Sequence, residues 1–410
     1  MFNLDSFINE YVIKRDRSMF AVDVEANKDA LSEKICGKSV LVIGGAGSIG
    51  SSFIRSILLF DPAELVIVDT NENALTELTR SLRSSERFAK HIPDIFLPYP
   101  MDYNSVTFRR MFENHVRKGT DYHGFDIVAN FSAHKHVRSE KDIYSVEALL
   151  RNNLINAKDL LDLLSINPPE TYFCVSTDKA ANPVNIMGAS KRIMEDLIFA
   201  YSDKFPAKTA RFANVAFSNG SLPAGFIERI NHNQPLSAPS DVKRYFVSPE
   251  ESGQICMLSA MLGGNRNIFF PKLEEAQMTS FDKIAEDLLR SMGFEPEYCD
   301  SDEEAISKAA HMSFGKSYPV HFSKSDTSGE KSFEEFYIEG EALDMSRFTS
   351  LGVITDKPIP DKDRIIDLIT GLNRAFDQTN CTKTDIVGIL MDYLPNFEHI
   401  ETGKSLDGKM

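Results

Sequence analysis

The sequence lacks long hydrophobic runs, has few cysteines and carries less positive than negative charge. No stretch of about 18 consecutive apolar residues occurs, which argues against a membrane-spanning helix. Residues 1–17 alternate apolar and charged side chains and contain no signal-peptide core. We therefore expect a cytoplasmic protein without a membrane partner.

The five cysteines are scattered along the chain and are never spaced as Cys-x-x-Cys. An odd number without such pairs argues against a disulfide framework and against a zinc site. We therefore expect a reducing compartment and no structural metal. The five positions are Cys36, Cys174, Cys256, Cys299 and Cys381.

Positive charge is in deficit: 45 lysines and arginines face 60 aspartates and glutamates, so the formal net charge is −15. Such a surface repels a polyanion, and nucleic acid is therefore not an expected partner. A small anionic nucleotide is still compatible with this charge, because backbone dipoles at a helix N-terminus act locally.

Short apolar strands alternate with helices over roughly 175 residues, a pattern typical of α/β folds. Helices are expected between the strands, among them 76–87, 146–164 and 188–201. The alternation predicts a Rossmann-type doubly wound parallel sheet with right-handed crossovers. The expected strands are 39–43, 64–69, 95–98, 126–131, 172–176 and 209–212.

A glycine-rich turn at 44–50 follows the first strand and opens a helix, with the spacing G-x-x-G-x-x-G. The first glycine permits a tight turn, the second lets a pyrophosphate approach the backbone, and the third lets helix and strand pack. The helix N-terminus then presents free N–H groups to the phosphates. A purely structural glycine turn is the alternative. The expected cofactor contacts here are Gly44, Gly47, Ser48, Ile49 and Gly50.

Two acidic residues follow the next strands. Asp69 ends the second strand, 19 residues after Gly50, where a carboxylate can bind the ribose 2′-hydroxyl of NAD and repel the 2′-phosphate of NADP. NAD is therefore the expected cofactor, although Asn71 and its successors could reshape the pocket. Asp102, after the third strand, is expected to meet the adenine amino group.

The segment 132–136 follows the fourth strand and contains two histidines. His134 and His136 are two residues apart without a nearby cysteine or carboxylate partner, which makes a poor metal site. We expect cofactor and substrate contacts here instead, with Ala133 and Lys135 on the cofactor and His136 on the substrate.

A reactive cluster follows the fifth strand: Thr177, Asp178 and Lys179, with Met187 and Lys191 on the next helix. In many short-chain dehydrogenases the i,i+4 pair on that helix is Tyr and Lys, and the Tyr transfers a proton. Methionine cannot do so, and either another group transfers the proton or there is no catalysis. The nearby candidates are Thr177, Asp178 and Lys179. A core methionine and a solvent-facing lysine are the structural alternative.

After residue 214 the rhythm changes, because Gly, Pro and Ser cluster at 218–225 and 235–240. We therefore predict three parts. Residues 1–36 form a helical extension, 37–222 an NAD-binding Rossmann domain to which 245–270 return, and 223–410 a smaller mixed α/β substrate-binding lobe with a C-terminal extension.

These motifs resemble the extended short-chain dehydrogenase/reductase family of nucleotide-sugar enzymes. More narrowly, the chain is similar to the soluble UDP-N-acetylglucosamine 4,6-dehydratases of bacterial polysaccharide and nonulosonate synthesis, in the branch with Met in place of Tyr. The blocks that carry the resemblance are 44–50, 133–137, 176–191, 211–215, 244–246 and 329–331 with Glu334-Glu335.

The resemblance implies an internal redox cycle on a UDP-N-acetylhexosamine. NAD takes hydride from C4, the C5 proton and C6 hydroxyl leave as water, and the hydride returns to C6. By position, Asp178 would be the acid for the C6 hydroxyl and Lys179 the C5 base. Thr177 would act at the C4 hydroxyl, and Lys191 would hold the ribose.

The resemblance also implies further contacts and a homo-oligomer. The family often has Arg-Pro-Gly-Glu-Lys where this chain has Thr-Ser-Gly-Glu-Lys at 327–331, so Arg244 or Lys331 would replace the missing arginine at the diphosphate. Asn153 is a further expected cofactor contact. The implied substrate contacts are His136, Asn214, Arg244, Glu330 and Lys331.

Two rival interpretations stay open. A UDP-sugar 4-epimerase would share cofactor and substrate but would return hydride to C4. It needs no acid–base pair at C5 and C6, so Asp178 and Lys179 favour the dehydratase. A non-catalytic dinucleotide sensor that lost its tyrosine would bind cofactor without turning over any UDP-sugar.

Overall fold

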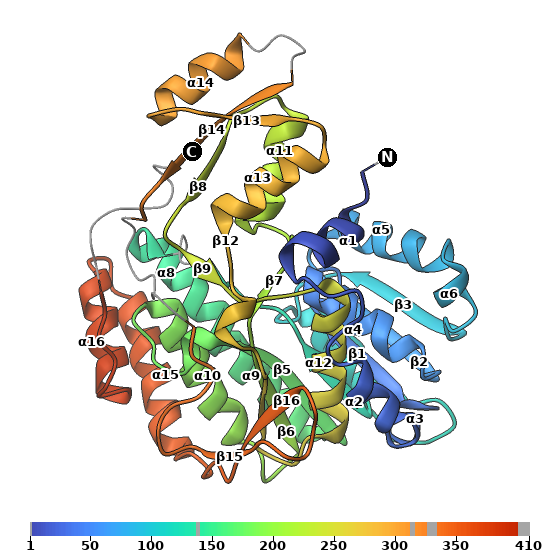
Figure 1. Ribbon diagram of the computed structural model, residues 1–410. Helices are drawn as coiled ribbons and strands as arrows, with labels where there is room; N and C mark the ends of the chain where they lie inside the picture. The colour runs from blue at the N-terminus through green and yellow to red at the C-terminus, as the bar shows by residue number, and fades with distance from the viewer. Residues whose placement is uncertain (1, 137–139, 312–315, 326–333, 401–410) are drawn as a thin grey trace.

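The computed structural model describes residues 2–136, 140–311, 316–325 and 334–400, and its centre is one nine-stranded sheet (Figure 1). Neighbouring strands pair parallel from β3 through β11, which confirms the predicted doubly wound α/β fold. In spatial order the strands are β15 (Ala342–Asp344), β16 (Leu351–Thr355), β11 (Ile268–Pro271), β6 (Ala207–Phe212), β5 (Thr171–Thr177), β4 (Ile127–Asn130), β1 (Ser39–Ile43), β2 (Glu64–Asp69) and β3 (Ile95–Pro100).

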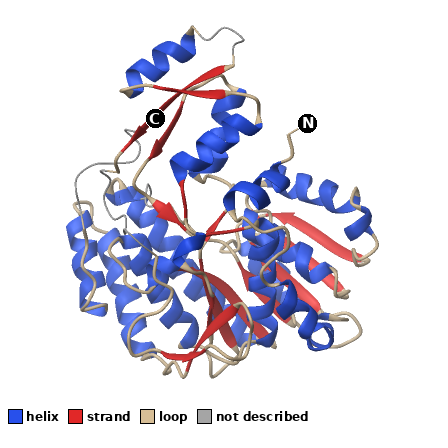
Figure 2. Cartoon of the chain, in the orientation of Figure 1, coloured by secondary structure: helices blue, strands red, loops and turns tan. Residues whose placement is uncertain are grey.

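The central strands are apolar along their length because helices cover both faces of the sheet. All residues of β1 and β4 are buried. Helices α4 and α12 pack against each other over one face, and α9, α10 and α15 lie over the other (Figures 1 and 2). The covering helices are α4 (Ser48–Leu58), α5 (Glu72–Arg83), α6 (Glu86–Ala89), α7 (Val106–Asn114), α8 (Ile143–Leu150), α9 (Asn156–Ile166), α10 (Ile186–Phe199), α12 (Pro249–Leu262), α15 (Lys362–Phe376) and α16 (Lys383–Tyr393).

Two predicted helices differ in detail. The helix expected at 76–87 begins earlier, at Glu72, because the side chain of Asn71 accepts a hydrogen bond from the backbone of Ala74 and caps it. The helix expected at 146–164 is interrupted by a π-helical turn at Arg151–Ile155. Apolar periodicity does not mark a single π turn.

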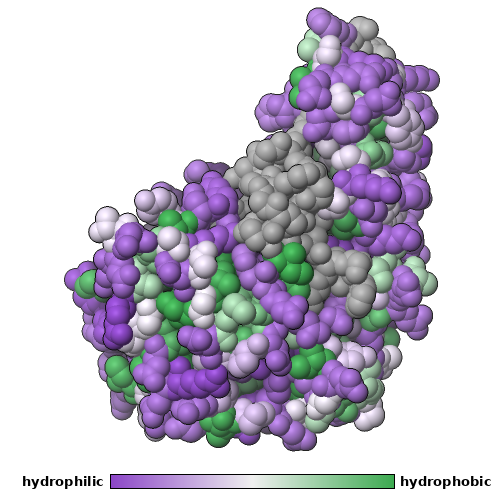
Figure 3. All heavy atoms as spheres, turned by 90° about the vertical axis from the view of Figure 1, so that its left-hand side faces the viewer, coloured by the Kyte–Doolittle hydropathy of each residue, from purple (hydrophilic) through white to green (hydrophobic). Residues whose placement is uncertain are grey.

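A smaller lobe stands above the sheet and has a hydrophobic core of its own (Figure 1). Seen from the side, it rises over one flank of the larger body, and most of the described surface in that view is hydrophilic (Figure 3). Its elements are β8 (Leu236–Pro239), β13 (Glu295–Tyr298), β14 (Ser317–Ser323), α11 (Leu222–Asn231), α13 (Phe281–Ser291) and α14 (Asp302–Ala310), and the strand order is β13-β14-β8.

Short paired segments connect sheet and lobe around the carboxyl ends of the strands. Strand β7 (Asn214–Val215) pairs with β10 (Phe246–Val247), and β9 (Lys243–Arg244) pairs with β12 (Thr279–Ser280). These crossings place residues of the second half of the chain beside the ends of β5 and β6. The predicted domain boundaries stay a prediction. Strand β16 falls within 223–410, the range predicted for the smaller lobe, but it lies in the large sheet.

The N-terminal segment contains α1 (Leu4–Phe7), a π-helical turn (Ile8–Val12), α2 (Ala21–Ala26) and α3 (Lys28–Ile35). Its first part contributes to the core of the smaller lobe and its second part to the core of the sheet. No helix in the described part of the chain is both long and apolar enough to cross a bilayer.

Candidate active site

The glycine-rich loop sits at the switch point of the sheet, where β1 lies between β2 and β4. Gly44 has φ of +70°, and a Cβ there would lie 2.7 Å from the backbone nitrogen of Ser132. A Cβ on Gly50 would lie 2.3 Å from the Gly44 carbonyl oxygen. Both glycines are therefore required by close backbone approach between the loop, β4 and α4.

Gly47 differs from the other two, because a Cβ there would meet only the Gly44 carbonyl oxygen, at 3.4 Å, among the described residues. Gly47 is also the N-cap of α4 and provides no capping side chain. The first-turn N–H groups of α4, which include those of Ser48 and Ile49, therefore face an open cradle. This cradle fits the pyrophosphate of a dinucleotide.

Asp69 lies at the end of β2 and holds the loop with its carboxylate. Its Oδ2 accepts a hydrogen bond of 3.0 Å from the Ala46 nitrogen, and Oδ1 accepts one of 2.9 Å from the Asn71 nitrogen. Each carboxylate oxygen keeps a further lone pair for a ribose hydroxyl. Asn71 is engaged in capping α5, and Asp102 lies just beyond β3.

The segment after β4 is tied to the helices behind it by Asn153. The Asn153 side chain accepts from the His134 nitrogen at 2.9 Å and donates to the His134 carbonyl oxygen at 3.0 Å. It also donates to Ser190 Oγ on α10 at 3.1 Å. Asn153 therefore positions the segment that carries Ala133 and Lys135.

The strand-end residues Thr177, Asp178 and Lys179 lie in contact with one another. Thr177 Oγ1 donates to Asp178 Oδ1 at 2.7 Å, and Lys179 Nζ lies 3.4 Å from the same oxygen. The Asp178 side chain is 6% exposed and that of Lys179 25%. A buried carboxyl, a hydroxyl and a more accessible amine thus meet beyond β5.

Helix α10 supplies the second group of reactive candidates. Met187 is buried, so its thioether belongs to the core. Lys191 is buried as well, and its Nζ donates to the Val175 carbonyl oxygen at 3.1 Å. Burial lowers the pKa of Lys191 to about 8, because the charged amine is removed from water. The solvent-facing alternative for Lys191 is therefore wrong.

The start of α10 is fixed by two acceptors that the sequence did not single out as site residues. Asn185 Oδ1 accepts from the Gly188 nitrogen at 2.7 Å. The buried carboxylate of Glu140 accepts from the nitrogens of Ile186 and Met187. A carboxylate at this position is favourable because it satisfies free N–H groups and faces the positive end of the helix dipole.

Beyond β6, a further carboxylate, that of Glu334, comes from a segment distant in sequence. Glu334 is buried and accepts from Asn214 Nδ2 at 2.6 Å and from the Tyr245 nitrogen at 2.8 Å. Arg244 Nε lies 4.0 Å from its Oε1. Two predicted substrate contacts, Asn214 and Arg244, are thus brought together around a residue whose role the sequence left open, although it belongs to one of the motifs.

The remaining predicted contacts are placed unequally. The His136 ring lies beside Gly220, because a Cβ on that glycine would be 3.0 Å from His136 Nε2. Glu330 and Lys331 lie outside the described residues. Within the described part of the chain, no group of three or more His, Cys, Asp or Glu side chains could hold a metal ion.

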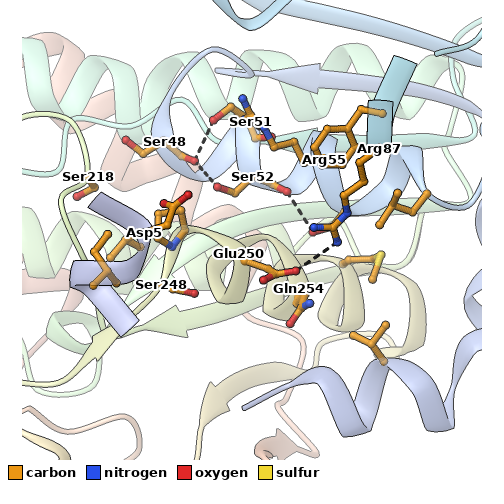
Figure 4. A pocket seen from close by; sticks show the side chains of 18 of the residues that line it. Asp5, Ser48, Ser51, Ser52, Arg55, Arg87, Ser218, Ser248, Glu250 and Gln254 are labelled. Atoms are coloured by element: carbon orange, nitrogen blue, oxygen red, sulfur yellow. Dashed lines mark hydrogen bonds and ion pairs between the residues drawn. The ribbon is translucent and has the colours of Figure 1, made fainter. Parts of the chain in front are cut away.

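A cavity of about 860 Å³ lies on the outer side of α4, walled by α1, α12 and the segment after β7 (Figure 4). Of the predicted cofactor contacts, Ser48 is in its wall, and Ser48 Oγ accepts a hydrogen bond from the Asn219 nitrogen at 2.8 Å. The strand-end cluster is not part of this wall. The cavity therefore backs onto the glycine-rich loop and is separate from the reactive groups.

Comparison with known proteins assigns the family. Residues 40–355 match the family described as "Polysaccharide biosynthesis protein". The chain belongs to this family. It is a member of the extended short-chain dehydrogenase/reductase group, as the motifs at 44–50 and 176–191 predicted.

This chain is 28% identical over 364 residues to a curated relative, the probable polysaccharide biosynthesis protein EpsC of Bacillus subtilis. That match covers 87% of this chain and 57% of EpsC, so the chain spans little more than half of that relative. It is also 24% identical over 318 residues to a UDP-glucose 4-epimerase of Rickettsia bellii, covering 74% of this chain and 87% of the epimerase.

Two solved structures show the same fold. Pen from Bacillus thuringiensis aligns with a TM-score of 0.59 at 18% identity, covering 80% of this chain and 90% of Pen. DesIV, a dTDP-glucose 4,6-dehydratase from Streptomyces venezuelae solved with NAD, aligns with a TM-score of 0.51 at 18% identity, covering 72% of this chain and 87% of DesIV. At these identities the likeness is one of fold.

Proposed function

We propose that this chain is an NAD-dependent UDP-N-acetylglucosamine 4,6-dehydratase. The observation that carries the proposal is the joined cluster of Thr177, Asp178 and Lys179 at the end of β5, at the same edge of the sheet as the glycine-rich loop after β1. Dehydration between C5 and C6 needs an acid and a base at neighbouring carbons. An adjacent carboxyl and amine supply that pair without a tyrosine.

The cofactor proposal is supported by Asp69 and Lys191. Asp69 would accept the ribose hydroxyls and would repel a 2′-phosphate, which favours NAD over NADP. Lys191, buried beneath the cluster, would hold the nicotinamide ribose with its remaining N–H donors. When bound, the nicotinamide would accept the C4 hydride and return it at C6. The NAD in the DesIV structure is consistent with this assignment.

The cluster residues divide the proton transfers by position and exposure. Asp178, buried and in contact with the Thr177 hydroxyl, would give a proton to the C6 hydroxyl as it leaves. Lys179, more exposed, would take the C5 proton in its neutral form and later return one. Thr177 would contact the C4 hydroxyl directly or through water. Oxidation at C4 is what makes the C5 proton acidic enough for an amine.

The substrate proposal is a UDP-N-acetylhexosamine bound across the smaller lobe. Asn214 and Arg244 lie at Glu334, and His136 lies beside Gly220. We propose these three residues as substrate contacts, together with Glu330 and Lys331, which lie outside the described residues. The similarity to EpsC, a probable polysaccharide biosynthesis protein, supports a nucleotide sugar. We further propose a homo-oligomer that works in the cytoplasm.

A UDP-sugar 4-epimerase is the second candidate, favoured by the Rickettsia relative. Proton NMR of the purified protein with UDP-N-acetylglucosamine and NAD distinguishes the two. The dehydratase forms a new C6 methyl signal without added reductant, and substrate deuterated at C4 places the deuterium in that methyl group. An epimerase leaves the C6 hydroxymethyl intact, and a non-catalytic sensor produces no change.

Variants of the cluster test the assigned roles. Asp178→Asn and Lys179→Ala should each lower the rate of methyl formation at least about hundredfold, because general acid–base catalysis typically contributes that much. Cofactor binding should persist. Asp203→Asn and Lys204→Ala serve as matched controls, because Asp203 and Lys204 are likewise an acid and an amine at consecutive positions but are exposed. Wild-type turnover in either cluster variant would remove the assignment of that residue.

A further inference from the structure

Glu334 is a buried carboxyl for which the proposed reaction has no use. Its side chain is 2% exposed, and both oxygens accept hydrogen bonds, Oε1 from Asn214 and Oε2 from the Tyr245 nitrogen. Both donors are neutral. A buried carboxylate normally requires a closely paired cation, because transfer of a charge from water is costly.

Glu195 shows what such pairing looks like in the same molecule. It is equally buried, but Arg211 contacts it through two nitrogens, at 2.9 and 2.8 Å. Although burial acts to raise the pKa of Glu195, the Arg211 guanidinium lowers it below its usual value. Among the described residues Glu334 has no such partner: the Arg244 Nε is 4.0 Å away, and Arg244 Nη1 donates to the Lys243 carbonyl oxygen.

Four titratable groups of the described chain face Glu334. Asp178 and Lys179 approach from the end of β5, and Arg244 and Tyr245 from the crossing segment. Burial raises the pKa of Glu334 to about 8, and the negative charge of Asp178 adds to the increase. Lys179, the hydrogen bond from the Tyr245 nitrogen and Arg244 oppose the increase. Two carboxyls in one pocket resist simultaneous ionisation.

We propose that Glu334 is a positioning residue that stays uncharged beside Asp178 and Lys179, so that this pair can exchange its proton without a third charge. An ionised Glu334 would add a third charge beside Asp178 and Lys179 and so bias the proton exchange between them. The inference rests on the proposed dehydratase for its kinetic part, but the protonation of Glu334 is a property of the folded chain itself.

Glu334→Gln is the decisive variant, because it keeps the size of the side chain and cannot ionise. The oxygen of the introduced amide can accept from the Tyr245 nitrogen, and rotation of the Asn214 amide lets its oxygen accept from the introduced amide nitrogen. Glu335→Gln is the matched control, since Glu335 is the adjacent carboxylate and accepts from Asn182 at 2.9 Å.

Two measurements test protonation without turnover. Infrared spectra of wild type and of each variant are compared at about pH 6.5, below the raised pKa of Glu334. Wild type should show a protonated carboxyl C=O stretch that is absent from Glu334→Gln and present in Glu335→Gln. In thermal unfolding, the Glu334 pKa is raised in the folded state, so its contribution to stability is full at low pH and is lost as pH rises through about 8. The Tm of wild type relative to Glu334→Gln should therefore fall between about pH 5.5 and about pH 8.5.

The kinetic measurement is kcat against pH at saturating substrate and NAD, which reports groups that ionise in the bound complex. Lys191 is present in both wild type and Glu334→Gln, so a difference between their two profiles reports Glu334. Wild-type kcat should decline through about pH 8, and Glu334→Gln should retain its plateau at least about one pH unit higher. Glu334→Asp, which restores an ionisable group, should restore the decline. Rates lowered equally at every pH in Glu334→Gln would show a structural anchor only.

The outcomes separate this inference from the proposed function. Absence of product in wild type overturns the dehydratase, whereas the infrared and unfolding experiments still decide on Glu334. Absence of the carboxyl band together with identical pH dependence of Tm overturns the inference, whatever the reaction.

Discussion

Single residues set the geometry of the glycine-rich loop. Gly44 and Gly50 allow backbone approaches that a Cβ would prevent, whereas Gly47 leaves open the space where a pyrophosphate would lie. Asp69 completes the loop by accepting from Ala46. The loop is thus closely packed at Gly44 and Gly50 and open at Gly47.

Gly50→Ala should therefore damage the cradle. Its Cβ would lie 2.3 Å from the Gly44 carbonyl oxygen and 2.8 Å from the Gly45 Cα, so the loop must shift. We expect a loss of about 1–3 kcal/mol in the free energy of unfolding, typical of overpacking, and at least about tenfold weaker NAD binding. Urea denaturation and a dinucleotide fluorescence titration measure the two effects.

Gly388→Ala is the control for that variant, because no atom of the described residues lies within 4 Å of a Cβ at this position in α16. Alanine should stabilise the helix by up to about 1 kcal/mol and leave NAD affinity unchanged. Equal affinities of wild type and Gly50→Ala would contradict the proposed role of the loop.

The N-terminal segment is an element whose position depends on one ion pair. Arg15 contacts Glu251 through Nε and Nη2, both at 2.7 Å, and the Glu251 side chain is fully buried. Glu251 also accepts from the nitrogens of Met19 and Ser248, the second of which completes the capping box of α12. The segment is therefore fastened to the helix that packs on α4.

Arg15→Ala should lower the free energy of unfolding by about 3 kcal/mol, because it leaves a buried carboxylate without its cation. Arg17→Ala removes an exposed arginine from the same segment and should change stability by less than about 0.5 kcal/mol. Urea denaturation of both variants gives the comparison. Equal stability of the two would show that the Arg15–Glu251 pair does not contribute to holding the segment.

Across the whole molecule, Arg211 joins the sheet to the segment that follows Glu334. Its guanidinium contacts Glu195 on α10 and Glu341, and it donates to the Phe336 carbonyl oxygen at 2.9 Å. Glu341 is further paired with Lys357 at 2.8 Å. This buried network places the strand-end cluster and the late segment in one rigid arrangement.

Arg211→Met should cost about 3–5 kcal/mol of stability, since two buried carboxylates lose their shared cation. It should also increase the rate of limited proteolysis between residues 336 and 341, because the Phe336 anchor is lost. Arg290→Met, which breaks a more exposed pair with Glu286 in the smaller lobe, should cost about 0.5 kcal/mol or less. Urea denaturation gives the free energy of unfolding of both variants. Equal losses in the two would show that the Arg211 network does not stabilise the fold.

The fold and the front of the site could be read from local patterns. The strands at 39–43 and 64–69, the glycine turn and the Thr177–Lys179 cluster are each encoded by neighbouring residues, so periodicity and spacing identify them. Contacts made from far along the chain could not be predicted in this way. Strand β16 joins the sheet antiparallel between β11 and the edge strand β15, and such pairing follows no local signal.

The sequence by itself determined that a doubly wound sheet would carry a dinucleotide loop after one strand, β1, and a carboxyl–amine pair after another, β5. Only the tertiary structure decided that Glu334, 120 residues from its partner Asn214, would be buried beside that pair. The tertiary structure also decided that Lys191 would be buried, with its amine donating to the Val175 carbonyl oxygen of β5. The physical reason is that burial and charge coupling depend on distances in space, which a linear chain does not specify.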